Sequence, residues 1–198
     1  CDERFNEALT YIDKLSADVV LITRWTLRMF PIDGMDMVMP YVNSEGDVEL
    51  ERYREYDVYE NGKFYRDAAT KKRHLSDFVE RFSQVSQTLY LIYPVPELAI
   101  NIEHVNRAHY RRHDEVLPEI SIPYTEYKER NDFVLSVFDS IESENIMRIR
   151  PAQILCDSFI KDRCAAQYQG VPFYYDDDHL SNVGAKMVVD KIFEAIPD

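Results

Sequence analysis

The alternation of helix-like and strand-like segments is the feature that most limits what this chain can fold into. In the helix-like segments apolar residues recur three or four positions apart, whereas the strand-like segments are short continuous apolar runs. The helix-like segments are residues 3–15, 76–86, 124–141 and about 181–195, and the strand-like ones are 19–23, 89–93, 146–149 and 171–175. Short strands separated by helices form parallel sheets covered on both faces. We therefore expect an α/β domain with a three-layer α/β/α architecture and a mainly parallel sheet.

Residues 30–69 do not follow this alternation. They are rich in Tyr, Asp, Glu and Met, and a long aperiodic excursion inside an α/β domain is usually a functional loop or a small hairpin. Within it, residues 48–58 and 63–65 are expected to supply strands. Its tyrosines could line a sugar-binding cleft, but aromatic residues also fill cores and the undersides of loops, and we favour this packing role. The tyrosines in question are Tyr53, Tyr56, Tyr59 and Tyr65.

Size and charge narrow the possible partners. The 198 residues are enough to bury a sizeable core as one domain. The chain has 23 Lys and Arg against 36 Asp and Glu, which gives a formal net charge of −13. A field of this sign repels phosphate backbones, so we expect no nucleic-acid partner. No apolar run in the sequence approaches the roughly 20 residues that span a bilayer.

The most informative motif lies near the C-terminus, where Asp176 precedes His179 by three residues at the change from strand to helix. On such a turn the carboxylate can reach the imidazole, fix its tautomer and stabilise the imidazolium that forms when the ring takes a proton. These are two members of a hydrolase triad. The third would be a nucleophilic serine, but no serine has a Gly-x-Ser-x-Gly or Gly-Asp-Ser setting. Ser158 comes closest, and it lacks the glycine of a nucleophile turn.

The acidic run before His179 and the other histidines also have interpretations that involve no catalysis. The run Asp176, Asp177 and Asp178 could be a solvated acidic loop or could hold a hard cation such as Ca²⁺ or Mg²⁺. The mid-loop glycine and the final glutamate of an EF-hand do not follow, so we expect no metal. His109 and His113 have the spacing of a helical metal pair, but the two arginines between them oppose a cation. We expect a solvated basic helix face there.

The stretch Asp-x-x-His-Leu-Ser-x-x-Gly-Ala at residues 176–185 resembles the last sequence block of the SGNH (GDSL-like) hydrolases, which have a flavodoxin-like fold. It is most similar to the form fused behind membrane-bound acyltransferase type 3 domains, which O-acylate sugars and cell-surface glycans. Residues 17–25 look like that group's strand ending in Arg-Trp, and Cys156 and Cys164 look like its paired cysteines. The resemblance spans roughly residues 1–195.

Two blocks of this family are missing from the sequence. Neither the nucleophilic serine block nor the Gly-x-Asn that completes the oxyanion hole is found, and the chain opens at Cys1 without a methionine. We therefore expect residues 1–198 to form a single SGNH-like domain that lacks its N-terminal strand and its nucleophile-serine block.

The resemblance implies roles for particular residues. His179 would act as general base and then general acid, with Asp176 orienting it, on a serine upstream of this fragment. Arg24 and Trp25, or the backbone amides beside them, would help to hold the oxyanion or the substrate. The alternative for Arg24 is a structural ion pair, with Trp25 filling the core.

The resemblance also implies a disulfide between Cys156 and Cys164, which would place the domain in an oxidising compartment. From the sequence alone, two free thiols in a reducing cytosol are the alternative. Cys1 would be left over.

As to function, the resemblance implies that an acyl group, expected to be acetyl, arrives from an upstream membrane acyltransferase domain and leaves on a carbohydrate hydroxyl. It implies no metal and no organic cofactor. The domain would lie on the extracytoplasmic or lumenal side of a membrane protein. The alternative, from another functional class, is a catalytically silent domain of the same fold that binds a glycan or a partner protein.

Overall fold

The three-dimensional structure is a computed structural model that describes residues 2–22, 38–42, 48–52, 58–60, 62–65, 67–98, 101–112 and 117–196. Its centre is a parallel sheet with the strand order β1-β6-β8. These strands are β1 (Val19–Leu21), β6 (Leu89–Ile92) and β8 (Ile146–Ile149). Val19 pairs with Leu89, and Leu89 in turn pairs with Ile146. The parallel sheet expected from the short apolar runs is confirmed.

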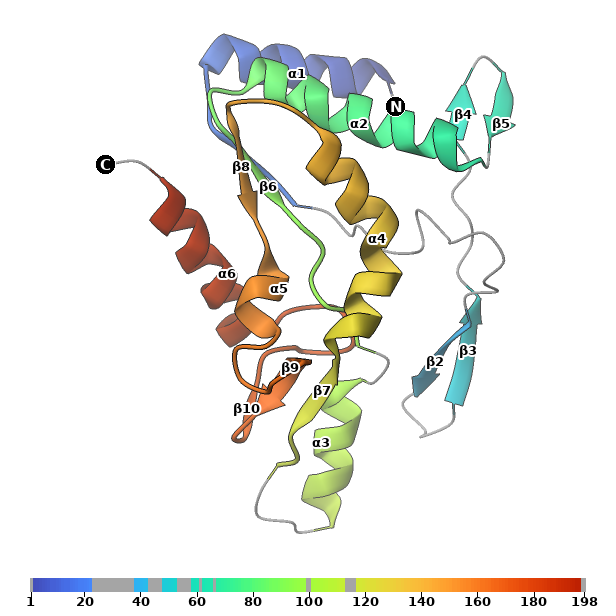
Figure 1. The fold of residues 1–198 in the computed structure, drawn as a ribbon, viewed down its shortest axis with the longest axis vertical. Helices are drawn as coiled ribbons and strands as arrows, with labels where there is room; N and C mark the ends of the chain where they lie inside the picture. The colour runs from blue at the N-terminus through green and yellow to red at the C-terminus, as the bar shows by residue number, and fades with distance from the viewer. Residues whose placement is uncertain are drawn as a thin grey trace.

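Helices cover both faces of this sheet, as Figure 1 shows. The described helices of the molecule, not all of which cover the sheet, are α1 (Asp2–Leu15), α2 (Ala68–Val85), α3 (Ile102–Arg111), α4 (Tyr124–Ser140), α5 (Pro151–Leu155) and α6 (Asn182–Ala195). One face packs on α2 and α4 through a cluster that includes Val79, Leu91 and Phe138. The other face packs on α6, where Ile92 and Ile149 meet Val188. The three-layer α/β/α architecture is therefore confirmed.

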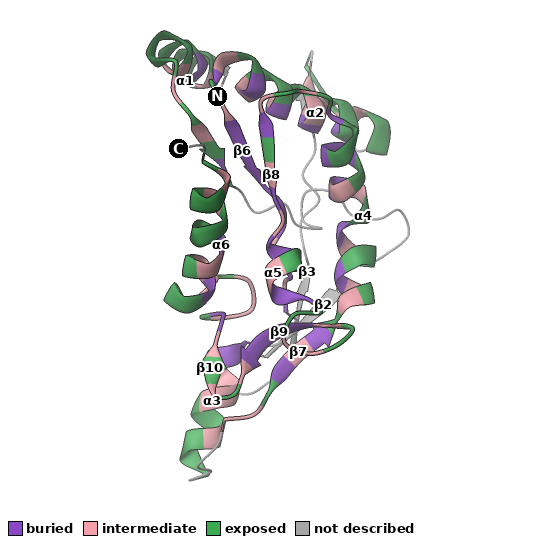
Figure 2. Cartoon of the chain, turned by 60° about the vertical axis from the view of Figure 1, so that its left-hand side comes forward, coloured by how far each residue is buried: buried purple, intermediate pink, exposed green. Residues whose placement is uncertain are grey.

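The central strand explains why an apolar run was visible in the sequence. All four residues of β6 are buried, because alternate side chains serve opposite helical layers. Leu89 and Leu91 belong to the cluster with α2 and α4, whereas Ile92 belongs to the one with α6. Figure 2 shows the same contrast, with buried residues along β6 and exposed ones on the outer surface of α6.

A second sheet stands at the end of the molecule where the chain leaves β6 (Figure 1). It is antiparallel, with the order β10-β9-β7, and consists of β7 (Ile120–Pro123), β9 (Arg163–Tyr168) and β10 (Val171–Pro172). The sequence interpretation was wrong here. Residues 171–175 do not join the parallel sheet, because Val171 and Pro172 pair with Tyr168 and Gln167 in a hairpin. Gln169 and Gly170 both have positive φ, as a two-residue hairpin turn requires.

The remaining strands lie in the segment that breaks the alternation. The hairpins pair β2 (Val38–Val42) with β3 (Val48–Arg52), and β4 (Val58–Glu60) with β5 (Lys63–Tyr65). The strand expected at 63–65 is confirmed, and the one expected over 48–58 is represented by β3 and the start of β4. Tyr53 and Tyr56 lie outside the described residues, and Tyr65 is half-buried.

Among the described helices, none is both long and apolar enough to cross a membrane.

Candidate active site

The Asp–His motif lies on a closed turn between β10 and α6. The turn is held by two backbone hydrogen bonds, from Tyr175 N–H to the His179 carbonyl at 2.7 Å and from Ser181 N–H to the Phe173 carbonyl at 2.9 Å. A third bond, from Leu98 N–H to the Asp177 carbonyl at 2.7 Å, joins the turn to the segment that follows β6. The turn is thus fixed beyond the carboxyl end of the central parallel strand. Sites in open α/β sheets form at this edge.

Asp176 contacts His179 as the three-residue spacing predicts. The imidazole Nδ1 lies 2.8 Å from Asp176 Oδ2 and 3.1 Å from Oδ1. Asp176 Oδ1 also accepts hydrogen bonds from the backbone N–H groups of Asp178 at 3.0 Å and His179 at 2.7 Å. The carboxylate therefore holds the ring and the backbone of the turn at once. A proton on Nδ1 leaves Nε2 as the nitrogen that can accept a proton from a substrate or a nucleophile.

Asp178 is a contact that sequence reasoning missed. Its Oδ1 also lies 2.8 Å from His179 Nδ1, and its side chain is 5% exposed compared with 22% for Asp176. Two carboxylates thus converge on one ring nitrogen. Only the Asp-x-x-His spacing drew attention to Asp176, and no sequence signal separates Asp178 from the exposed acids of an ordinary loop.

The same three side chains offer ligand atoms within 4.8 Å of one another, which is also compatible with a metal ion. A metal ion on Nδ1 would take the place of the proton that the ring shares with Asp176. Nδ1 cannot bind a metal ion and carry this proton at the same time. The expectation of no metal therefore remains a prediction.

The residues after His179 position the turn on α6. Ser181 is the N-cap of this helix, as expected, and its Oγ accepts a hydrogen bond from Gly184 N–H at 3.3 Å. The Ser181 hydroxyl donates to the Pro172 carbonyl at 2.8 Å, so its proton is already engaged. Gly184 lies against the Phe173 carbonyl, and a Cβ atom at this position would be 2.1 Å from that oxygen. The Leu-Ser-x-x-Gly spacing thus lets the helix approach the strand closely.

His179 faces solvent at a pocket of about 700 Å³. Its side chain is 68% exposed, and Asp176, Tyr175 and Ser181 line the same pocket. Within the described part of the chain, no serine hydroxyl donates a hydrogen bond to His179. The structure thus brings the imidazole of His179 and the carboxylate of Asp176 into contact at an open pocket.

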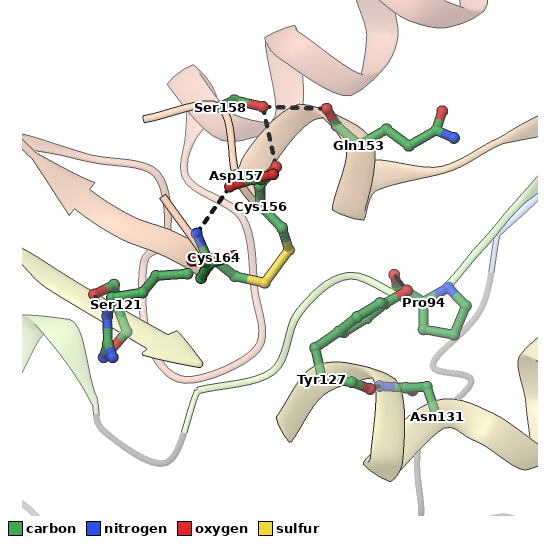
Figure 3. Close-up of a disulfide and its surroundings, with 11 residues drawn as sticks. Pro94, Ser121, Tyr127, Asn131, Gln153, Cys156, Asp157, Ser158 and Cys164 are labelled. Atoms are coloured by element: carbon green, nitrogen blue, oxygen red, sulfur yellow. Dashed lines mark hydrogen bonds between the residues drawn. A yellow bond between two sulfur atoms is a disulfide. The ribbon is translucent and has the colours of Figure 1, made fainter. Parts of the chain in front are cut away.

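Ser158, the serine nearest to a nucleophile setting in the sequence, is engaged elsewhere. Its hydroxyl lies 3.2 Å from the carbonyl oxygens of Gln153 and Cys156, as Figure 3 shows. It makes no hydrogen bond to His179. This geometry gives Ser158 a local role in closing the loop after α5.

Cys156 and Cys164 form a disulfide, with 3.7 Å between their Cα atoms (Figure 3). Both cysteines are buried, and the bond joins the end of α5 to β9. β9 pairs with β10, the strand that leads into the Asp–His turn. The expected disulfide is present, and it stabilises the β9–β10 hairpin from which the turn extends. Cys1 lies outside the described residues.

The structure describes only some of the other residues considered in the sequence. Arg24 and Trp25, the oxyanion and substrate candidates, fall outside the described residues, as does His113. His109 lies in the last turn of α3, so a helix is present where a basic helix face was expected.

Comparisons with known proteins agree with this fold. A family model described as the SGNH domain (fused to AT3 domains) matches residues 1–194. Among solved structures, the periplasmic domain of a Salmonella ser. Paratyphi A lipopolysaccharide acetyltransferase has a similar fold, with a TM-score of 0.54 and 16% sequence identity. The similarity covers 96% of this chain and 60% of that domain. A comparison with curated proteins found no match. The chain belongs to the SGNH domain family that occurs fused to AT3 domains.

Proposed function

We propose that this domain transfers an acyl group, acetyl in particular, to a carbohydrate hydroxyl through a Ser-His-Asp triad. In this triad His179 is the acid–base and Asp176 orients it. The observation that carries the proposal is the 2.8 Å contact between His179 Nδ1 and Asp176, beside a pocket into which the ring is exposed. Membership of the SGNH family and the fold shared with an acetyltransferase domain support an enzyme of the hydrolase or acyltransferase type.

The proposed reaction has two half-reactions. The serine Oγ attacks the acyl carbonyl carbon while its proton passes to His179 Nε2, and His179 then gives that proton to the departing group of the donor. In the second half, a sugar hydroxyl attacks the acyl-serine, His179 takes the hydroxyl proton, and the serine recovers it as the new ester leaves. Asp176 stabilises the imidazolium in both halves without taking up the proton itself.

The nucleophilic serine is proposed to come from a segment of the protein other than the residues described. β1 pairs with β6 along one edge, and no described strand pairs along its other edge. Val20 and Ile22, which stand at or just after this strand, are exposed, although strands of parallel sheets are normally covered on both faces. A further parallel strand would pair with this edge of β1 and would end on the same side of the sheet as the Asp–His turn, and the helix connected to it could cover these side chains.

The donor is proposed to be an upstream membrane acyltransferase domain, and the domain itself to be extracytoplasmic. The family description names fusion to AT3 domains, and the structural neighbour is a periplasmic domain. The disulfide supports the same compartment.

The test is substitution of His179 in the intact protein, with acetyl transfer to its carbohydrate and hydrolysis of a small acetyl ester as readouts. His179→Ala should lower both rates by several orders of magnitude while thermal unfolding remains nearly unchanged. His109→Ala, on α3, serves as a matched control. Unchanged turnover in His179→Ala would overturn the triad and favour the alternative of a catalytically silent binding domain.

A further inference from the structure

A second hollow adjoins the His179 pocket. It has a volume of about 550 Å³ and lies between α3 and the turn that carries the Asp–His pair. Pro172, Tyr175 and Ser181 line both hollows, so the two adjoin at the turn that carries His179. We call this second hollow the α3 groove. A molecule bound in it would lie beside the turn that carries His179.

The wall formed by α3 is firmly anchored. Asn106 and the fully buried Gln167 of β9 exchange two side-chain hydrogen bonds, at 2.6 and 2.9 Å. Gln167 also donates to the Pro118 carbonyl at 2.8 Å. At the start of the helix, Asn101 accepts a hydrogen bond from His104 N–H at 3.1 Å, and Ile102 is buried. A groove with a fixed wall suits a preformed binding site, because little order is lost when a ligand binds.

The groove presents aromatic rings to solvent. Tyr110 of α3 is 63% exposed and Tyr175 of the turn is 64% exposed. Exposing two large aromatic side chains in one groove leaves apolar surface uncovered. The C–H faces of a pyranose ring can cover such surface while its hydroxyls remain solvated.

The groove is also basic in an acidic protein. Arg107 and Arg111 line it against one carboxylate, Glu103, whereas the whole chain has a net charge of −13. Glu103 pairs with Arg107 one helical turn away. Arg111 makes no ion pair with any residue that the structure describes. A guanidinium in this position favours a carboxylate or a phosphate group.

From these contacts we infer that the α3 groove binds the carbohydrate acceptor, and that this acceptor carries an anionic group, a carboxylate or a phosphate, which Arg111 recognises. The inference rests on the proposed function, because it assigns the acceptor of the same site. Tyr110 and Tyr175 would pack on the sugar ring. The hydroxyl to be acylated would then lie at the end of the groove nearest His179.

The experiment measures binding without turnover, using calorimetry on the intact protein with His179→Ala. The charged probe is a tetrasaccharide of alternating glucuronic acid and N-acetylglucosamine, and its neutral counterpart is the tetramer of N-acetylglucosamine. Glucose 6-phosphate and inorganic phosphate form a second pair. The charged tetrasaccharide should bind at least about tenfold more tightly than the neutral tetramer, since a hydrogen bond to a charged group is stronger than one between neutral groups.

Three variants test whether the probes bind in the α3 groove. Arg111→Gln should lower affinity for the charged sugars about tenfold and abolish their advantage over the neutral tetramer. Tyr110→Ala should weaken both tetrasaccharides. Arg4→Gln removes the same charge from an exposed position on α1, at the opposite end of the molecule in Figure 1, and should change nothing.

The contrary outcomes are distinct. Equal binding of neutral and charged tetrasaccharides would overturn the anionic recognition, and inorganic phosphate that binds as tightly as glucose 6-phosphate would overturn the sugar site. No binding by any probe, or equal losses in Arg111→Gln and Arg4→Gln, would overturn the groove. Failure of the triad is read separately, from unchanged acetyl turnover in His179→Ala compared with the protein that keeps His179, and does not affect these binding measurements.

Discussion

At the scale of single residues, the contacts around His179 separate the duties of two carboxylates. Asp176 contacts the ring nitrogen and accepts two backbone N–H groups, whereas Asp178 contacts the ring nitrogen from a more buried position. Asp176 therefore fixes the turn as well as the tautomer. Asp178 brings a second carboxyl group to the same ring nitrogen.

In the intact protein, Asp176→Asn should lower kcat by a factor that approaches ~10⁴, by analogy with the serine protease triad, because an amide favours the wrong ring tautomer. Asp178→Asn should have a smaller effect, since Asp176 still holds Nδ1. The measurement is the rate of acetyl-ester hydrolysis for both variants at equal folded concentration. A damaging Asp178→Asn beside a silent Asp176→Asn would reverse the assignment of the orienting carboxylate.

At the scale of elements, the disulfide joins α5 to β9 and so supports the hairpin that leads into the turn. Replacing Cys156 and Cys164 together by alanine should lower the free energy of unfolding by roughly 2–3 kcal/mol in the loop-closure model. It should also reduce activity in the intact protein, because a looser hairpin misplaces Asp176 and His179. Urea unfolding and ester hydrolysis measure the two effects. Alkylation of both thiols in the non-reduced native protein would contradict the bridge.

A cluster of Tyr93, Asp139 and Arg150 joins the end of β6 to α4 and to the start of α5. Asp139 Oδ1 accepts hydrogen bonds from the Tyr93 hydroxyl at 2.7 Å and from Arg150 at 2.6 Å. Burial raises the pKa of Asp139, but the hydrogen bonds from Tyr93 and Arg150 outweigh it and hold the pKa below its ordinary value of 3.8. The ionised carboxylate is therefore preferred in the folded protein.

Since the folded pKa of Asp139 is the lower one, its contribution to stability is complete above pH 3.8 and is lost as the pH falls through the folded pKa. Asp139→Asn should lower the free energy of unfolding by about 1 kcal/mol at pH 7, because the ion pair between Asp139 and Arg150 is partly exposed to solvent. The difference between the two proteins should shrink below pH 3.8. Urea unfolding at several pH values measures it. If the difference in the free energy of unfolding between the two proteins grew as the pH fell, the predicted pH dependence would be wrong.

At the scale of the whole molecule, the site brings His179 and two carboxyl groups together, while no described serine hydroxyl reaches the ring. The chain of 198 residues should therefore show no turnover of a small acetyl ester, because none of the described serines is placed to form an acyl-enzyme with His179. The measurement is ester hydrolysis by the purified chain beside the intact protein. Turnover that disappears in Ser158→Ala would show that the nucleophile lies within this chain.

The sequence by itself determined the features that depend on near neighbours. The apolar run at 89–93 predicted a buried parallel strand because both faces of β6 are covered. The three-residue spacing of Asp176 and His179 predicted their contact, and Ser181 predicted the start of α6, since each involves residues within one turn of chain. Such local geometry follows from spacing and hydrogen-bonding capacity alone.

Only the tertiary structure decided what depends on distant neighbours. β9 has the sequence Arg-Cys-Ala-Ala-Gln-Tyr, whose small side chains carry no strand pattern, and it becomes a strand because β7, β10 and Cys156 hold it. The burial of Asp178 and the groove beside α3 likewise arise where separate segments meet. These contacts join residues tens of positions apart, such as Asn106 and Gln167. These contacts form only when the chain packs into its tertiary structure, so no local sequence pattern predicts them.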